Sequence, residues 1–172
     1  MRVGALSSGA GWTPGARGDG QRGRGFAYSR YKTIGMYAAV VVDVNIDRKS
    51  GIVRIPRVVI AADIGSVVNP DGARNQLEGG IVQVVSITLK EQLTFDRREI
   101  TSRDWAGYPI LTFPEVPSVE VLLMNRSEPS IGAGEGSLAP ASAAVANAFA
   151  HATGRRIRML PMTAERVKAA LA

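Results

Sequence analysis

The chain has 172 residues, enough for one domain of ordinary size, and 45% of them are hydrophobic, enough for a core. It has no cysteine and a single histidine, His151, which excludes disulfides and thiolate-ligated metal sites or clusters and argues against a histidine metal site or a Ser-His-Asp triad. The net charge of +6 favours an anionic partner such as a nucleic acid, a phosphate-bearing cofactor or an acidic subunit.

The start of the chain differs in composition from the rest. Glycine, serine and arginine dominate it without a helical or strand period, which predicts an irregular arm over residues 1–30 with little core of its own. Within the arm, residues 20–25 (GQRGRG) combine glycine with arginine. That composition is typical of a flexible basic linker, an RNA-binding tail or a glycine-rich loop against cofactor phosphates, and the spacing does not choose among them.

A β-hairpin is predicted next. Residues 36–46 (MYAAVVVDVNI) are rich in β-branched side chains, residues 47–51 (DRKSG) have the composition of a turn, and residues 52–63 (IVRIPRVVIAAD) form the second strand. Pro56 lacks a backbone N–H, so it predicts an edge or a bulge within that second strand.

A glycine-broken helix is predicted over residues 70–91, because apolar side chains recur there at i, i+3 and i+4 spacing. Asn69 is placed to cap its N-terminus, with Pro70 at the first helical position. Gly79 and Gly80 interrupt its middle, where each glycine costs roughly 1 kcal/mol relative to alanine. The pair predicts close approach by a ligand or by another part of the backbone.

The remaining elements are short. We expect strands at residues 93–95, 119–124 and 156–160, and helices at residues 140–153 and 164–171. Gly154 is suited to end the first of these helices, and Thr163 is suited to cap the second. The fold class is therefore α+β, with a hairpin and further strands packed against the glycine-broken helix and a C-terminal helix of small residues.

The stretch 131–140 (IGAGEGSLAP) is the strongest candidate site. It places one carboxylate, Glu135, beside Gly132, Gly134 and Gly136. Glycines let the backbone adopt positive φ and approach a ligand closely, and they leave the carboxylate accessible to a large planar molecule. An alternative is a plain glycine-rich turn whose glutamate interacts with the dipole of the following helix.

The order and spacing of several motifs resemble the C-terminal part of the molybdopterin-binding large subunit of the xanthine dehydrogenase/aldehyde oxidase family. These motifs are VVNP at 67–70, QLEGG at 76–80, YP at 108–109, GAGE at 132–135, AVANA at 144–148 and the tail at 154–167. SITLKEQ at 86–92 and SRDW at 102–105 look most like the isoquinoline 1-oxidoreductase and nicotinate dehydrogenase branch. The resemblance covers nearly the whole chain from about Gly20.

This resemblance implies a molybdenum hydroxylase that oxidises an N-heteroaromatic compound or an aldehyde by water-derived oxygen insertion and hydride transfer to molybdenum. Glu135 then falls on the catalytic glutamate, which acts as a general base. Gln76 falls on a glutamine that hydrogen-bonds near the metal and pterin, and Gly79 and Gly80 would let their helix approach the cofactor. The cofactor-contacting turn contains Gly132 and Gly134. The implied cofactor is molybdopterin, in its cytosine dinucleotide form, and the protein supplies no direct metal ligand.

The resemblance also implies partners. Because a family large subunit is several times longer, residues 31–172 are expected to be a portion of its C-terminal domain, inactive without the remainder of that subunit. Electrons are expected to leave through iron–sulfur clusters on a small [2Fe-2S] subunit, since this chain has no cysteine. No run approaches the roughly 18 apolar residues of a membrane-spanning helix. Members of the branch occur in the cytoplasm and some large subunits are exported, so the compartment is left open, with the cytoplasm favoured and the periplasm as the alternative.

Two other hypotheses remain open at this level. An α+β body with a basic arm is compatible with an RNA-binding module, although the few aromatic residues near the arm argue against base stacking. A catalytically inactive remnant that only packs on a partner would carry the same motifs. One departure concerns Gly136, which stands where many family members have proline and therefore predicts a looser turn beside Glu135.

Overall fold

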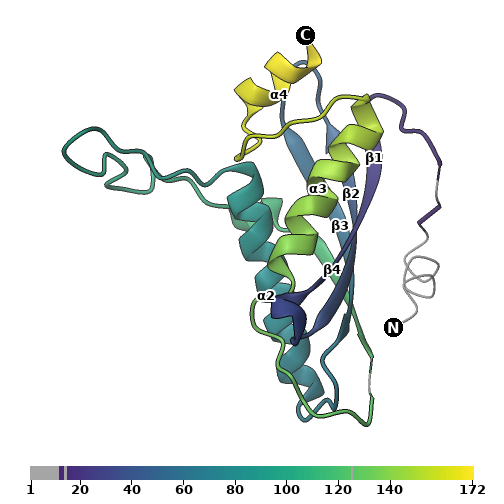
Figure 1. The fold of residues 1–172 in the computed structure, drawn as a ribbon. Coiled ribbons are helices and arrows are strands. Elements are labelled where there is room, and N and C mark those ends of the chain that lie inside the picture. The colour runs from purple at the N-terminus through teal and green to yellow at the C-terminus, as the bar shows by residue number, and fades with distance from the viewer. Residues whose placement is uncertain (1–11, 14, 125) are drawn as a thin grey trace.

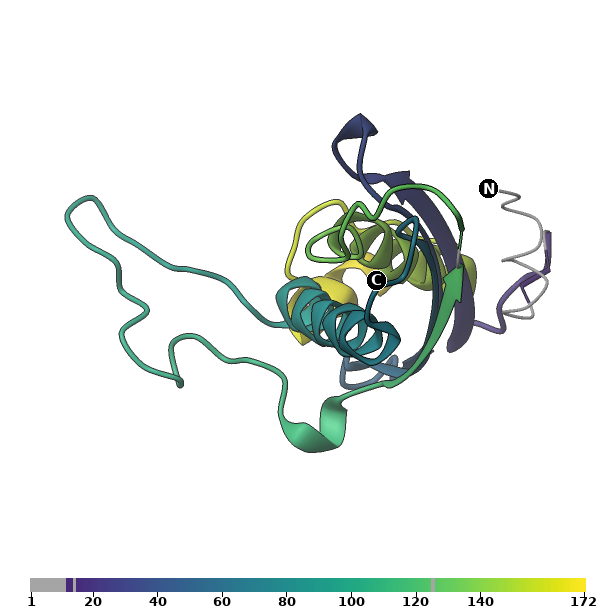
Figure 2. The same cartoon turned by 90° about the horizontal axis from the view of Figure 1, so that it is seen from below.

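The computed structural model describes residues 12–13, 15–124 and 126–172. Four strands form one sheet in chain order, and they are β1 (Arg22–Arg30), β2 (Tyr37–Ile46), β3 (Val53–Asp63) and β4 (Ser118–Met124). The first three strands are antiparallel, whereas β4 runs parallel to β3. Two long helices, α2 (Pro70–Leu89) and α3 (Leu138–Thr153), cover one face of this sheet (Figures 1 and 2). The expected α+β class is confirmed.

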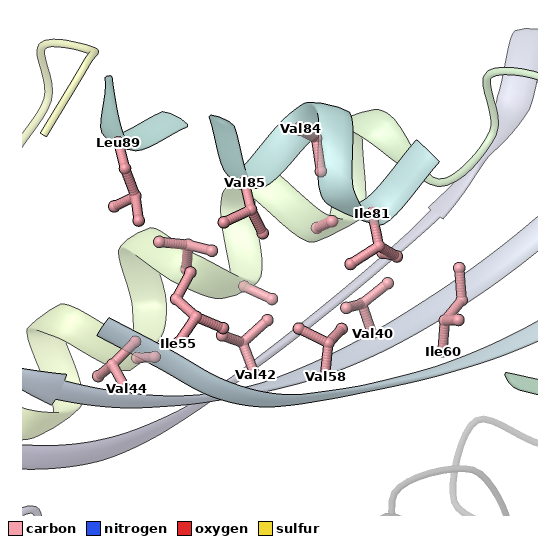
Figure 3. Close-up of a cluster of buried hydrophobic side chains, with 14 of the residues drawn as sticks. Val40, Val42, Val44, Ile55, Val58, Ile60, Ile81, Val84, Val85 and Leu89 are labelled. Carbon is pink, nitrogen blue, oxygen red and sulfur yellow. The ribbon is translucent and has the colours of Figure 1, made fainter. Parts of the chain in front are cut away.

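The centre of the sheet is buried on both faces. Figure 3 shows the inner face, where side chains of β2 and β3 point toward side chains of α2. The labelled residues of this core are Val40, Val42, Val44, Ile55, Val58, Ile60, Ile81, Val84, Val85 and Leu89. On the outer face, Val41 and Val59 pack with Phe26 of β1. Burial on both sides explains why the apolar runs of these strands are nearly continuous.

The predicted hairpin and helix boundaries are largely confirmed. The register of β2 against β3 shifts between Asp43 and Asn45, which places a bulge beside Pro56, as expected from its missing N–H. Asn69 caps α2 by accepting a hydrogen bond from Gly72 N–H at 2.9 Å. Gly154 ends α3 with a φ of 73°. The last helix, α4 (Ala164–Leu171), is capped by Thr163, as predicted.

Strand β1 corrects the prediction of an irregular arm, which is wrong for residues 22–30. Gly23 and Gly25 of this strand lie directly beneath α3, where a Cβ on Gly25 would come within 2.1 Å of Ala144 O. Asn147 of α3 also donates a hydrogen bond to Phe26 O at 3.0 Å. The glycines therefore serve close packing of a strand against a helix, and not flexibility. Residues 1–11 and 14 of the predicted arm lie outside the described residues.

Two predicted strands are absent from the described part of the chain. At residues 93–95 the structure has only an isolated bridge between Phe95 and Ile100, and residues 156–160 have no strand. A strand needs a partner, and the N–H of nearby Met162 bonds instead to Thr88 O at 2.7 Å, at the end of α2. An alternating pattern of apolar and polar residues alone is therefore not enough to establish a strand.

A long arm, residues 91–111, leaves the body between α2 and the short helix η2 (Phe113–Glu115), as Figures 1 and 2 show. Glu115 holds the two ends of this arm together. Its carboxylate lies 2.5 Å from Lys90 Nζ and accepts a hydrogen bond from Thr112 N–H at 2.8 Å. One carboxylate therefore contacts both ends of the arm.

This clasp predicts a specific acid sensitivity. Burial raises the pKa of Glu115, but the bonds from Lys90 and Thr112 outweigh burial and lower the pKa from 4.5 to about 2. Because the folded-state pKa is depressed, the stabilisation is complete above 4.5 and is lost as the pH falls toward 2. We expect Glu115→Gln to show a smaller drop in unfolding temperature than the wild type between about pH 7 and about pH 3. Thermal unfolding followed by circular dichroism measures this difference, and Glu78→Gln on α2 is the control. An equal drop in wild type and Glu115→Gln would contradict the assignment.

Candidate functional site

The candidate site lies at the edge of the sheet where β3 and β4 both end. Because these strands are parallel, with Asp63 opposite Met124, the loops that follow them start side by side. Ligands of α/β sheets bind at such carboxyl-terminal edges. The two loops are joined by hydrogen bonds from Ser66 N–H to Glu128 O at 2.8 Å and from Ile131 N–H to Ile64 O at 3.0 Å.

An ion pair with a buried aspartate fixes this edge. Asp63, with a side chain only 3% exposed, lies 2.7 Å from Arg126 Nη1 and also accepts the N–H of Gly65 at 3.2 Å. The hydrogen bond from Arg126 to Asp63 raises the pKa of the arginine. Removing Arg126 would leave a buried carboxylate without its charged partner, which is strongly destabilising, so the pair locks the two loops together.

An open hollow of about 440 Å³ lies between these loops and the first half of α2. Its lining residues are Ile64, Val68, Asn69, Gly72, Ala73, Gln76, Ser130, Gly132, Ala133 and Gly134. The structure thus brings together three of the residues that the sequence singled out, namely Gln76, Gly132 and Gly134. Gly132 has a φ of 78°, and a Cβ on either glycine would meet nothing within 4 Å, so the backbone there borders open space.

Glu135 follows this lining directly but is not part of it. Its side chain is exposed, and its Oε2 atom accepts a hydrogen bond from the hydroxyl of Tyr31. No local sequence pattern signals Tyr31, because the contact joins residues 104 positions apart. The carboxylate is therefore exposed to solvent, one residue beyond Gly134 of the lining, with a phenol as its hydrogen-bond donor.

The glycine pair of α2 does not line the hollow. Gly79 is exposed, with nothing within 4 Å of an added Cβ, whereas Gly80 is buried and a Cβ there would lie 2.4 Å from Ser137 Oγ. Gly80 thus makes room for the start of α3. A cofactor contact for either glycine stays a prediction.

Ser137 carries a buried polar atom. Its Oγ atom has no hydrogen-bond partner among the described residues, although it immediately precedes α3. A serine there normally accepts a backbone N–H two or three residues on, but the third residue is Pro140, which has no N–H. A buried hydroxyl without a partner costs about 1–3 kcal/mol. The contact between Gly80 of α2 and Ser137 therefore contains one destabilising buried polar atom.

Gly136 corrects the expectation of a looser turn. The residue is buried, and a Cβ there would lie 2.2 Å from Met36 Cγ. Met36 itself is 2% exposed. The turn beside Glu135 is therefore packed by a methionine from the loop between β1 and β2.

Among the described residues, no cluster of three or more histidine, aspartate or glutamate side chains is arranged to hold a metal ion. In the same part of the chain, no helix has both the length and the apolar character needed to cross a bilayer. His151 has a structural contact, because its Nδ1 atom accepts the backbone N–H of Arg24 at 3.2 Å.

Comparison with known proteins identifies relatives of this arrangement. The chain is 51% identical over 163 residues to one of the subunits of nicotinate dehydrogenase from Pseudomonas putida, covering 91% of this chain and 14% of that protein. It is 33% identical over 138 residues to the beta subunit of isoquinoline 1-oxidoreductase from Brevundimonas diminuta, covering 80% of this chain and 17% of that protein. The chain thus spans less than a fifth of the length of each of these relatives.

Solved structures agree with these matches. Aldehyde oxidoreductase from Desulfovibrio gigas superposes with a TM-score of 0.71 at 29% identity over 79% of this chain and 15% of that chain. Quinoline 2-oxidoreductase from Pseudomonas putida 86 superposes with a TM-score of 0.74 at 26% identity over 79% of this chain and 18% of that chain. The family model of the molybdopterin cofactor-binding domain matches residues 2–117. The chain therefore belongs to the molybdopterin cofactor-binding domain family of the xanthine dehydrogenase/aldehyde oxidase type of molybdenum oxidoreductases.

Proposed function

We propose that this chain is the glutamate-bearing portion of a molybdenum hydroxylase, with Glu135 as the general base. The observation that carries the proposal is that Gln76, Gly132 and Gly134 line one hollow and that exposed Glu135 directly follows Gly134 in the chain. A rigid pair of loops, joined by the ion pair of Asp63 and Arg126, supports this arrangement.

The residues present fit a molybdopterin cofactor. Open space borders Gly132 and Gly134, so a planar group can lie against the backbone there without meeting a side chain. Gln76 offers both a donor and an acceptor from α2. When bound, the cofactor would supply the oxygen-transfer and two-electron redox chemistry of the family. We infer the cytosine dinucleotide form of the cofactor from the resemblance to the isoquinoline 1-oxidoreductase and nicotinate dehydrogenase branch.

Glu135 would accept the proton of the water-derived hydroxyl that attacks substrate carbon. A general base acts over about 2.6–3.2 Å, and the exposed side chain of Glu135 is accessible to a bound group at that distance. The substrate that we propose is an N-heteroaromatic compound, because the names of two relatives specify nicotinate and isoquinoline, with an aldehyde as the second choice. Glu135→Gln in the reconstituted complex, with turnover and molybdenum content both measured, tests the proposal.

The projecting arm of residues 91–111 supports a role for this chain within a larger assembly. Six large apolar side chains on or beside it are exposed, and they are Leu93, Phe95, Ile100, Trp105, Ile110 and Phe113. Exposed apolar surface of this kind marks an interaction site. We infer that the arm packs on the remainder of the large subunit. We also infer that electrons leave through the clusters of a separate [2Fe-2S] subunit, since this chain has no cysteine.

A double substitution tests the role of the arm. Trp105 and Phe113 are 73% and 93% exposed, so Trp105→Ser with Phe113→Ser should leave the body folded. Recovery of the tagged complex after co-expression with the rest of the large subunit should fall by about tenfold or more, because buried aromatic anchors commonly contribute at least 2 kcal/mol. Arg97→Ser with Arg98→Ser, on the same arm, is the matched control. Wild-type recovery of the aromatic variant would refute the docking role.

The RNA-binding alternative has no support in the described residues. Arg22 and Arg24 belong to strand β1, and Arg24 pairs with Asp43 at 2.5 Å. The remaining alternative, a remnant that only packs on a partner, predicts unchanged turnover for Glu135→Gln and is therefore separated from the proposal by the same experiment.

A further inference from the structure

The loop between β1 and β2, residues 31–36, contacts the glycine turn at two adjacent points. The hydroxyl of Tyr31 donates a hydrogen bond to Glu135 Oε2. At the next residue of the turn, Gly136, the side chain of Met36 fills the neighbouring space, so that a Cβ would lie 2.2 Å from its Cγ atom. The proposed base and its neighbour are thus both held by one loop from a distant part of the sequence.

This loop is itself closely constrained. Tyr31 N–H donates to Met36 O at 2.9 Å, and Gly35 N–H donates to Tyr31 O at 2.7 Å. Between these bonds, Lys32 and Thr33 have φ values of 48° and 60°, which residues other than glycine seldom adopt. Such strained backbone persists where its surroundings determine it, and it concentrates at functional sites. The ring of Tyr31 packs against the main core, and this packing holds the hydroxyl in place.

The residues that precede Glu135, by contrast, do little to restrain its side chain. It follows Gly132 and Gly134, both exposed and without neighbours within 4 Å of an added Cβ, and its own side chain is exposed. A glutamate in this setting has several accessible rotamers. A donor bound to one carboxylate oxygen selects one rotamer and leaves the other oxygen to accept a proton.

We propose that Tyr31 is a positioning residue that orients the carboxylate of Glu135 through its hydroxyl. The inference rests on the proposed function of Glu135 as the base. It adds a specific role to a residue outside the glycine turn and explains why the tight loop of residues 31–36 docks there.

Tyr31→Phe in the complete molybdenum-loaded complex tests this role. The variant keeps the ring and its packing but removes the donor. We expect kcat to fall by about tenfold, because a hydrogen bond to a charged group is worth about a factor of ten or more, with KM and molybdenum content unchanged. Tyr28→Phe is the matched control, because that ring stacks on Tyr37 on the same strand-and-loop unit, and it should keep wild-type kcat.

A second measurement does not depend on turnover. The carboxylate stretching bands of Glu135 are assigned by their absence in Glu135→Gln, using infrared spectra of complex isolated from molybdenum-deficient cells. A donor on one oxygen makes the two C–O bonds unequal, so Tyr31→Phe should shift these bands whereas Tyr28→Phe should not. Unshifted bands in Tyr31→Phe would overturn the inference, whatever the kinetics. If Glu135→Gln retained turnover while the bands shifted in Tyr31→Phe, the contact would stand and the proposed base would be wrong.

Discussion

Replacing Glu135 by glutamine should lower kcat of the assembled enzyme by roughly 10²–10⁴. Glutamine has nearly the same size and still accepts a hydrogen bond from the hydroxyl of Tyr31, so the turn and the contact are retained. What it loses is the ability to take up a proton at the operating pH. Steady-state kinetics with a nicotinate-type and an aldehyde substrate, normalised to molybdenum content, measures the loss.

The control for this experiment comes from the same segment. Glu128 is exposed, lies 3.3 Å from Arg126 Nη2 and is not among the residues that line the hollow. Glu128→Gln should therefore leave kcat and molybdenum content close to wild type, because an exposed ion pair contributes little. A variant Glu135→Gln with full turnover and full molybdenum content would show that this carboxylate is not the base.

Gly25→Ala should strongly destabilise the protein. The added Cβ would lie 2.1 Å from Ala144 O and 2.2 Å from Ala148 N, and backbone atoms within a helix cannot rotate away. Strand β1 and helix α3 must then separate, and overpacking of this kind costs about 3 kcal/mol. For a protein of this size, that corresponds to a fall in unfolding temperature of about 6–12 °C.

A matched glycine gives the opposite expectation. Gly79 lies in α2 with nothing within 4 Å of an added Cβ, so Gly79→Ala removes backbone freedom from the unfolded chain without a clash. It should stabilise the protein by about 0.5–1 kcal/mol. Differential scanning calorimetry of both variants compares the two effects directly. A Gly25→Ala protein as stable as Gly79→Ala would contradict the close packing of β1 on α3.

The difference between these glycines also explains what the sequence could and could not reveal. The hairpin and both long helices follow from apolar periodicity and from local caps such as Asn69 and Gly154, and all are confirmed. β1 was missed because its helix-facing positions are Gly23 and Gly25, which carry no strand preference. Its place in the sheet is decided by the small residues of α3, far along the chain.

The site shows the same division. The resemblance implied that Gln76 and the glycine turn both contact the cofactor; both line one hollow, and the cofactor contact itself stays a prediction. The resemblance implied the same role for Gly80, and that role stays a prediction; what the structure shows is that Gly80 lies against Ser137. The contact of Tyr31 could not be predicted from local sequence patterns, because its hydrogen bond to Glu135 depends on how two loops meet after the whole sheet has formed.

The contact between β1 and α3 has a consequence for biosynthesis. Strand β1 leaves the ribosome more than a hundred residues before α3, which ends at Thr153, so the face of β1 that packs on α3 stays uncovered until that helix has been translated. Contacts of such long sequence separation slow folding and prolong the lifetime of aggregation-prone intermediates. We therefore expect the uncovered face of β1 to be open to aggregation or chaperone binding during synthesis.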